Sequence, residues 1–450
     1  MKVPALKSGL YLRRKYTKAL EVQSTGSIVT GKKVEYSLCE LVNVSHISLV
    51  STGDRVLRGQ KIAREIDVTS APIYSAVSGQ VIGIEKKHNT TGVLADCIVI
   101  ENDEKYETVY SRIDKAGSSI DLISRNEIIK AIRMAGVREI SGGSASIFQK
   151  LALSENVHII INGLECEPFL SSSSQRILEN SEELFQGLRI LLKLFRNTMI
   201  IFAIAENRKD CRKLLNRLFS KEPFMKLELL QRKYPQGEEK LLIQSIMKKY
   251  NSLKKTPAKV DCFVLDVEDV LAIYQAVVLG EPKLERMVTV GGTCIANPGE
   301  YLVSIGTTYE ELIEATGGFT EEPQKVIIGG AMTGIALANL EASVTKRCSG
   351  VIALKEDELL KNPTTSCVNC GRCILVCPRQ LIPSMLAHLK PEDEVRFKYL
   401  GGEECLGCGS CSYTCPAKIE IAHSIDEMKQ QIAGKNISDR IIKKDLKNNG

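Results

Sequence analysis

Residues 367–378 are Cys367-Val368-Asn369-Cys370-Gly371-Arg372-Cys373-Ile374-Leu375-Val376-Cys377-Pro378, and residues 405–416 are Cys405-Leu406-Gly407-Cys408-Gly409-Ser410-Cys411-Ser412-Tyr413-Thr414-Cys415-Pro416. The two stretches share one spacing, C-x2-C-x2-C-x3-C-P, and together they hold eight of the chain's 15 cysteines. Thiolates at such short, regular intervals are ligands for iron or zinc. We expect this repeated pattern to determine the fold of the last part of the chain.

The spacing is typical of two-cluster bacterial ferredoxins, in which the fourth cysteine of each stretch binds the other stretch's cluster. On that rule, the two predicted [4Fe–4S] ligand sets are Cys367, Cys370, Cys373 with Cys415, and Cys405, Cys408, Cys411 with Cys377. Zinc is the alternative, but zinc sites usually combine two C-x2-C pairs across a long gap. Disulfides are disfavoured, because no secretory signal opens the chain and the cytosol keeps thiols reduced. A chain with two such clusters is expected to relay single electrons.

Composition predicts a large protein without a transmembrane segment. The chain has 450 residues, 44% of them hydrophobic, which is enough for three or four domains with buried cores. No apolar run approaches the roughly 18 residues that a transmembrane helix needs. The most apolar stretch, residues 199–205, is expected to be a buried strand. We therefore expect a cytoplasmic protein, or one peripheral to the inner face of the cell membrane.

The net charge of +6 is unevenly distributed. Residues 207–259 contain 15 Lys and Arg against 5 Asp and Glu. Such a stretch is either a solvated face on two helices or a docking surface for an acidic redox partner, such as a ferredoxin or flavodoxin. Nucleic acid is not an expected partner, because the stretch lacks the interleaved aromatic pattern that stacks bases.

The N-terminal part predicts a small β module. Residues 1–37 show no clear period and are expected to be an irregular lead-in. Residues 38–103 predict short strands, with turns at Gly53-Asp54 and Ser78-Gly79. This pattern is similar to the barrel-sandwich fold of lipoyl and biotinyl carriers. Those carriers modify a lysine at a hairpin tip, whereas residues 68–74 contain none, so we expect a structural or docking module.

The remaining chain predicts a multidomain protein of the α/β class. Residues 120–285 alternate helical and strand patterns, which indicates helices packed on a sheet. The strands expected there are 157–161, 199–204 and 260–264, and the helices are 126–135, 181–195 and 268–280. Residues 286–345 predict a small β-rich module, residues 355–430 a helical domain around the cysteine stretches, and residues 431–450 a polar tail whose end frays.

Taken in order, these parts resemble the RnfC family of Rnf-type electron transport complexes, and behind it the flavin- and NADH-binding subunit of respiratory complex I. Residues 162–168, Asn-Gly-Leu-Glu-Cys-Glu-Pro, are similar to the family's N-G-x-E-C-E-P segment, and residues 233–240 to its K-Y-P-Q-G-x-E-K segment. Residues 329–334 are similar to its G-G-x-M-x-G element. The resemblance covers residues 38–425. It implies a lipoyl-like barrel-sandwich module, a flavin-binding-like α/β domain, an SLBB β-grasp module and a two-cluster ferredoxin-like domain.

The resemblance also implies FMN as a cofactor and NADH as a substrate. The cofactor-binding positions that it implies are Gly142, Gly143 and Lys150 in a phosphate-binding loop, and Glu165, Glu167 and Glu238 near the flavin and nicotinamide. Each has a structural alternative. A plain strand-to-helix turn would explain the glycines, a solvated loop would explain Glu165 and Glu167, and a helix N-terminus, which favours acids, would explain Glu238.

Two functions are open at this point. In the first, an oxidoreductase subunit passes electrons from NADH through FMN and two clusters to Rnf membrane subunits or a ferredoxin-type acceptor. In the second, a soluble adaptor without flavin catalysis relays electrons through the clusters alone, for a system such as a proline reductase or cobalamin reductase. The second is favoured by the shortened glycine-rich loop at residues 140–150 and by Asp266, where the family has asparagine. The sequence identifies no catalytic residue.

Overall fold

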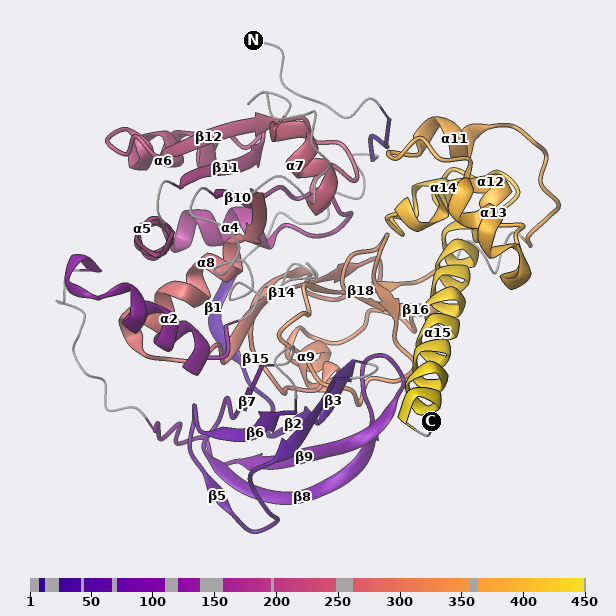
Figure 1. Cartoon of the computed structure of the whole chain (residues 1–450). Helices are drawn as coiled ribbons and strands as arrows, with labels where there is room; N and C mark the ends of the chain where they lie inside the picture. The colour runs from indigo at the N-terminus through magenta and orange to yellow at the C-terminus, as the bar shows by residue number, and fades with distance from the viewer. Residues whose placement is uncertain are drawn as a thin grey trace. The chain divides into compact units, whose positions relative to one another are not determined.

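The structure, a computed structural model, divides into two units (Figure 1). It describes residues 8–12, 24–41, 44–66, 71–109, 120–137, 157–195, 198–247, 262–356 and 363–448. The first unit comprises residues 1–4, 13–232 and 237–356, and the second comprises residues 5–12, 233–236 and 357–450. The second unit is thus assembled from three separate stretches of the chain.

Two four-stranded sheets form the N-terminal module of the first unit. One sheet has the order β2 (Lys33–Ser37), β9 (Leu94–Asn102), β8 (Gly79–His88), β5 (Arg55–Val56). The other has the order β3 (Cys39–Leu41), β4 (Val44–Ser48), β6 (Lys61–Glu65), β7 (Ile73–Tyr74). Apolar side chains such as Val34, Ile62 and Ile98 are fully buried in one core that both sheets share. This is the predicted barrel-sandwich.

The segment expected to be an irregular lead-in instead contains two strands, so that expectation was wrong. The strand β1 (Ser24–Val29) pairs in parallel with β15 (Gly299–Ser304), and β2 pairs antiparallel with β9. The first four residues of β1 are Ser, Thr, Gly and Ser, which give no alternating apolar signal. The partner strand far along the chain supplies the ladder that holds this segment extended.

A parallel sheet forms the centre of the α/β domain. Its order is β12 (Met225–Leu230), β11 (Met199–Ala205), β10 (His158–Gly163), β13 (Cys262–Asp266). Successive side chains of β10 enter different cores: Ile159 and Ile161 enter the larger one, and Ile160 enters the smaller one. Burial on both faces explains why these strands are continuous apolar runs and could be predicted.

Helices cover the two faces of this sheet (Figure 1). The larger core includes residues of α2 (Arg125–Met134), α4 (Ser172–Glu179), α5 (Ser181–Leu194), α6 (Lys209–Phe219) and α8 (Val267–Tyr274). The smaller core includes α7 (Glu239–Met247). Two short helical turns, η2 (Ile120–Leu122) and η4 (Gln275–Leu279), precede α2 and follow α8. The predicted strands and helices of this domain are therefore present, with ends shifted by a few residues.

A six-stranded sheet completes the first unit. Its order is β1, β15, β14 (Glu285–Gly292), β18 (Gly350–Leu354), β16 (Lys325–Ile328), β17 (Ile335–Ala336). The helix α9 (Tyr309–Ala315) contributes the fully buried Tyr309 to its core. This sheet contains the predicted β-rich module, but β1 and β18 extend it beyond residues 286–345.

Short helices and one long helix form the second unit. They are α11 (Arg372–Val376), α12 (Pro383–Leu386), η5 (Pro391–Asp393), α13 (Glu394–Tyr399), η6 (Gly402–Glu404), α14 (Ser410–Tyr413) and α15 (Ile421–Asn448). The expectation of a frayed tail was wrong, because α15 continues to Asn448. Buried Ile421, Ile425, Met428 and Ile432 lie on one face and anchor its first turns, and the helix-forming residues beyond them propagate it. In the part of the chain that the structure describes, no helix has both the length and the apolar character to cross a bilayer.

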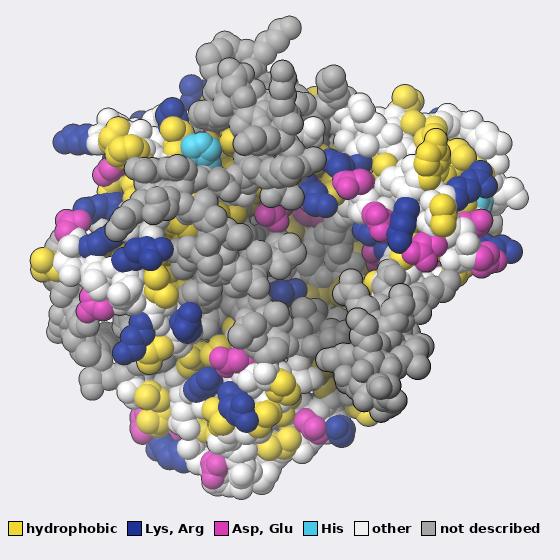
Figure 2. Space-filling model, in the orientation of Figure 1, with side chains coloured by type: hydrophobic (Ala, Val, Ile, Leu, Met, Phe, Trp, Pro, Cys, Tyr) yellow, Lys and Arg dark blue, Asp and Glu magenta, His cyan; other side chains and the backbone are white. Residues whose placement is uncertain are grey.

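The surface of the molecule carries charge of both signs. Figure 2 shows Lys and Arg side chains dispersed among acidic and apolar ones over the face that it presents. This face therefore does not have the single-sign field that would indicate a polyanionic partner such as nucleic acid.

Candidate functional site

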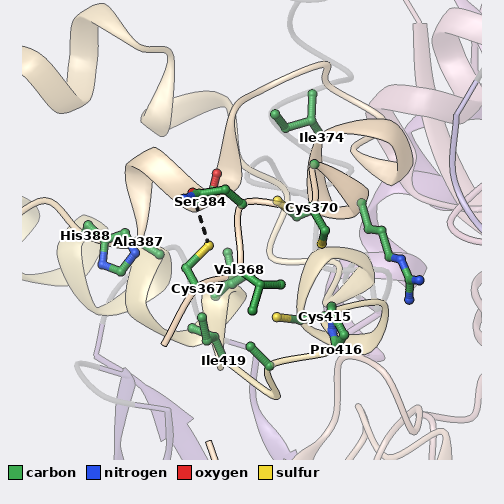
Figure 3. Close-up of a pocket in the computed structure, with 16 residues that line it drawn as sticks. Cys367, Val368, Cys370, Ile374, Ser384, Ala387, His388, Cys415, Pro416 and Ile419 are labelled. Atoms are coloured by element: carbon green, nitrogen blue, oxygen red, sulfur yellow. Dashed lines mark hydrogen bonds between the residues drawn. The ribbon is translucent and has the colours of Figure 1, made fainter. Parts of the chain in front are cut away.

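Four cysteines line a cavity in the second unit (Figure 3). Cys367, Cys370 and Cys373 come from the first cysteine stretch, and Cys415 comes from the second. We call this site cage 1. Its cavity has a volume of about 150 Å³. Figure 3 shows Cys367, Cys370 and Cys415 on three sides of this space.

The other four cysteines of the two stretches line a second, narrower cavity, which we call cage 2. Here Cys377 of the first stretch joins Cys405, Cys408 and Cys411 of the second, around a volume of about 20 Å³. Apolar side chains such as Leu381 complete the wall. Each cage thus takes three cysteines from one stretch and one from the other, which is the crossed grouping expected from the spacing.

The backbone of the two stretches repeats the same turns. Positive φ angles occur at three equivalent pairs of positions: Asn369 (54°) and Gly407 (65°), Gly371 (71°) and Gly409 (70°), Gln380 (56°) and Lys418 (54°). The second pair directly precedes α11 and α14, where glycine adopts the left-handed conformation without steric cost. The repeated sequence therefore produces two loops of the same shape that face each other across the cages.

The cages are wider than a site for a single ion. Among the residues that the structure describes, no three His, Cys, Asp or Glu side chains lie close enough to bind one metal ion. A lone zinc would require four sulfurs within about 2.3 Å of one point. Four thiols spread around a cavity, with no competing charged ligand, fit the donor set of a [4Fe–4S] cluster.

The two cages differ in exposure. Cys370 of cage 1 is exposed to solvent, whereas Cys377 and Cys411 of cage 2 are buried. Burial raises the pKa of Cys405 and Cys408, and raises the pKa of Cys411 to about 12. These thiols would therefore keep their protons until a metal displaced them. Solvent exposure also influences cluster potential, so clusters in the two cages should differ in potential.

A second candidate site lies at the carboxyl edge of the parallel sheet. The chain runs outward from β10 through β11 to β12, and then returns to place β13 on the other side of β10. Ligands of such folds bind outside the carboxyl ends of the strands, at this change of direction. Asn162 near the end of β10 pairs in register with Asp266 at the end of β13. The segment 162–168 therefore begins at the position where a ligand is expected.

Glu165, a predicted cofactor residue, is held by protein donors. Its Oε1 accepts from the backbone N–H of Ser174 at 2.7 Å, and its Oε2 accepts from Nε of Arg208 at 3.2 Å. Burial raises the pKa of the Glu165 carboxyl, and the Arg208 guanidinium opposes that rise. Arg232 Nε donates to the backbone oxygen of Glu165 at 3.4 Å. Sequence reasoning overlooked both arginines, although they follow the carboxyl ends of β11 and β12 and could have been found there.

Glu167 joins two loops of the first unit. Its Oε2 accepts from the backbone N–H of Met332 at 3.0 Å, and its Oε1 accepts from Oγ1 of Thr333 at 2.7 Å. A Cβ on Gly330 would lie 2.4 Å from Cδ of Glu167, so only glycine allows this close approach. Glu167 therefore fastens the segment 162–168 to the G-G-x-M-x-G element.

Two further acids serve helix N-termini. Glu238 Oε2 accepts from the backbone N–H of Leu241 at 3.1 Å, at the start of α7. Asp266 Oδ1 accepts from the N–H of Asp269 at 2.9 Å, and Asp269 returns the bond, which is a capping box for α8. Asn162 Nδ2 donates to the oxygen of Gly237 at 3.0 Å, so it links the segments 162–168 and 233–240. The other predicted cofactor residues, Gly142, Gly143 and Lys150, lie outside the described residues.

Four family models match the chain in order. They are the RnfC barrel sandwich hybrid domain at residues 9–105, the Nuo51 FMN-binding domain at 132–275, the SLBB domain at 287–336 and the 4Fe-4S dicluster domain at 366–419. These matches confirm the predicted types of module. Together with the cysteine cages, they define the class: an iron–sulfur electron-transfer protein of a multisubunit oxidoreductase.

Curated relatives show the family. The chain is 35% identical over 348 residues to the RnfC-type component of the proton-translocating ferredoxin:NAD(+) oxidoreductase complex of Clostridium ljungdahlii, with 77% of this chain and 76% of that protein covered. It is 29% identical over 363 residues to the Na(+)-translocating counterpart of Acetobacterium woodii, with 79% and 82% covered. The chain belongs to the RnfC family. Among solved structures, it is similar to a chain of an NAD+-reducing [NiFe]-hydrogenase in the air-oxidized state, at 17% identity and a TM-score of 0.43, covering 69% of this chain and 62% of that chain.

Proposed function

We propose that this chain passes electrons from NADH, through FMN and two [4Fe–4S] clusters, to a protein partner. The observation that carries the proposal is the pair of cages, each lined by three cysteines from one stretch and one from the other. Each cage offers the four thiolates that one [4Fe–4S] cluster needs. The exchange of the fourth ligand also makes both stretches contribute to both cages, which favours a short path between the clusters.

The carboxyl edge of the parallel sheet is the proposed FMN site. The match to the Nuo51 FMN-binding domain and the change of strand direction between β10 and β13 support this placement. Glu165 and Glu167 would shape the loop 162–168 through the protein donors that they bind, and Arg208 and Arg232 would add positive charge at the edge. A phosphate contact by Gly142, Gly143 and Lys150 stays a prediction. A bound flavin supplies the conversion of a two-electron hydride transfer into single-electron steps.

The proposed partner is another component of an Rnf-type complex. The two relatives described above are named as parts of ion-translocating ferredoxin:NAD(+) oxidoreductase complexes, and this chain covers more than three quarters of each. We propose that it likewise docks on membrane subunits, at the inner face of the cell membrane. A soluble ferredoxin or flavodoxin is the alternative acceptor, and the basic residues 207–259 would suit its acidic surface.

Anaerobic purification tests the proposal. We expect about eight irons and eight acid-labile sulfides per chain, together with extractable FMN. Addition of NADH should bleach the flavin absorbance and produce the electron paramagnetic resonance (EPR) signals of reduced clusters. About four irons, or zinc in place of iron, would contradict the two-cluster assignment.

A second candidate function is a cluster-only adaptor that serves a soluble reductase. It is favoured by one observation: Glu165, Glu167, Glu238 and Asp266 all bind protein donors in this structure. Such a protein would contain the full complement of iron but no FMN, and NADH would leave its clusters oxidised. The flavin content of anaerobically purified protein therefore separates the two functions.

A further inference from the structure

Two distant stretches of chain form a short backbone ladder inside the second unit. Leu10 N donates to the oxygen of Tyr234 at 2.8 Å, and Tyr234 N donates to the oxygen of Leu10 at 2.9 Å. The Lys233 ammonium lies 5.2 Å from the centroid of the Tyr11 ring, which is a cation–π contact. Lys233 and Tyr234 are both buried. The ladder is therefore a fixed part of the unit, although none of its residues belongs to a cysteine stretch.

Both strands of the ladder bind the backbone of cage 2. The Tyr234 hydroxyl donates to the carbonyl oxygen of Cys408 at 2.6 Å. Gly9 N donates to the oxygen of Val376 at 3.1 Å, directly before Cys377. One bond thus falls on a cage 2 ligand, and the other falls on the residue adjacent to a second ligand of the same cage.

The ladder requires glycine at one position. Gly9 has a φ of +92°, and a Cβ there would lie 2.4 Å from the carbonyl oxygen of Tyr234. A larger residue would push the two strands apart and with them the Tyr234 side chain. The close approach at Gly9 therefore helps to place the Tyr234 hydroxyl at Cys408.

Tyr234 is also near the candidate flavin loop along the chain. Gly237 follows three residues later, and its oxygen accepts the hydrogen bond from Asn162. Covalent geometry alone limits three residues to a span of roughly 10 Å. A short covalent path therefore leads from the segment 162–168 to the ladder that contacts cage 2.

We propose that Tyr234 is a positioning residue that makes cage 2 the first acceptor of electrons, leaving cage 1, with its exposed Cys370, to deliver them to the partner. This inference rests on the proposed function, since it needs a flavin donor. NADH gives up a hydride, and its two electrons pass singly through cage 2 and cage 1 to a one-electron acceptor protein. The hydroxyl bond withdraws electron density from the Cys408 peptide, and hydrogen bonds near cluster ligands favour the reduced state.

Redox titration of the full chain with dithionite, followed by EPR, tests the role of Tyr234. We expect Tyr234→Phe to lower the potential of the cage 2 cluster and to leave the cage 1 cluster unchanged. Tyr399→Phe is the matched control, because Tyr399 is on α13 of the same unit and is 88% exposed. The signals are assigned with Cys370→Ala and Cys408→Ala, each of which removes a ligand from one cage. Unchanged potentials in Tyr234→Phe, or an equal shift of both clusters, would overturn the proposal.

The order of the clusters is tested with the same cysteine variants. We expect NADH to reduce the remaining cluster in Cys370→Ala but not in Cys408→Ala, and the reverse result would overturn the order. If either variant loses both clusters, the rate of NADH-driven cluster reduction in Tyr234→Phe decides instead. It should fall several-fold while flavin reduction stays at the wild-type rate, and an unchanged rate counts against the proposal. If NADH does not bleach the wild-type flavin, the proposed function and the order both fall, whereas the dithionite titration still tests the Tyr234 bond.

Discussion

Glu300 on β15 is a buried carboxyl group between two hydroxyl donors. It accepts from Oγ of Ser171 at 2.6 Å and from Oγ1 of Thr289 at 2.8 Å. Burial raises its pKa to about 7, and the nearby acids Glu165 and Glu268 add to the rise. The folded protein therefore holds a proton on Glu300 over a pH range in which the unfolded chain has released it.

This shift gives a stability prediction with a definite sign. Because the folded pKa of Glu300 lies above its ordinary value of 4.5, the stabilisation is complete below about pH 4.5 and is lost as the pH rises to about 7. Glu300→Gln should remove this dependence, which amounts to at most roughly 3 kcal/mol. The measurement is the free energy of unfolding in urea, taken anaerobically at pH 5 and pH 7.5. Glu310→Gln, at an exposed position on α9, is the control, and equal pH slopes in wild type and Glu300→Gln would contradict the prediction.

Glu167 gives a second prediction at this scale. Glu167→Ala removes the acceptor for the Met332 N–H and the Thr333 hydroxyl, so we expect the free energy of unfolding to fall by about 1–3 kcal/mol. If the loop 162–168 holds FMN, the flavin content should fall as well. Thr333→Val removes only one of the two bonds and should have the smaller effect on both measurements. Equal effects of the two variants would show that the Met332 bond contributes nothing.

The residue scale also shows where sequence reasoning reached its boundary. The eight cage cysteines could be grouped from spacing alone, because the ligand pattern is local and repeated. The ion pair of Glu165 with Arg208, and the bond of Tyr234 to Cys408, join residues 43 and 174 positions apart. Such partners follow from the arrangement of strands, and no local pattern marks them.

At the scale of elements, the contact of α5 with α8 depends on a glycine. A Cβ on Gly187 would lie 2.6 Å from the backbone oxygen of Val270. Gly187→Ala should therefore lower the free energy of unfolding by about 1–3 kcal/mol through overpacking, although alanine favours helices. Gly434→Ala in α15, where a Cβ would meet nothing within 4 Å, should instead stabilise by about 0.5–1 kcal/mol. Urea unfolding of both variants checks the contrast, which fails if both shift in the same direction.

Elements with strong periodicity were predictable, and those without it were not. The strands β10 and β11 are buried on both faces, so their sequences are continuous apolar runs. The strand β1 has small polar residues and is held by β15, which lies more than 250 residues away in the sequence. The end of α15 was mistaken for a frayed tail, because its polar residues resemble a disordered segment as much as a solvated helix.

At the scale of the whole molecule, the two units should respond differently to loss of iron. The second unit has a small apolar core around Phe397 and Leu386, and metal binding in such small domains supplies folding free energy. Treatment with an iron chelator should therefore make residues 363–448 sensitive to protease, while the first unit keeps its urea midpoint. Limited proteolysis with mass spectrometry, before and after chelation, measures this. Cleavage distributed equally over both units would contradict it.

The three-part composition of the second unit restricts how this protein could be recombined with others. A fragment beginning at residue 357 would contain every cage cysteine, yet it would lack the glycine and the tyrosine that bind its backbone from outside. The C-terminal region is therefore not a portable ferredoxin that a gene fusion could move to a new host. Any transplant would have to bring residues 5–12 and 233–236 with it, so the cluster region and the domain in front of it are expected to be inherited together.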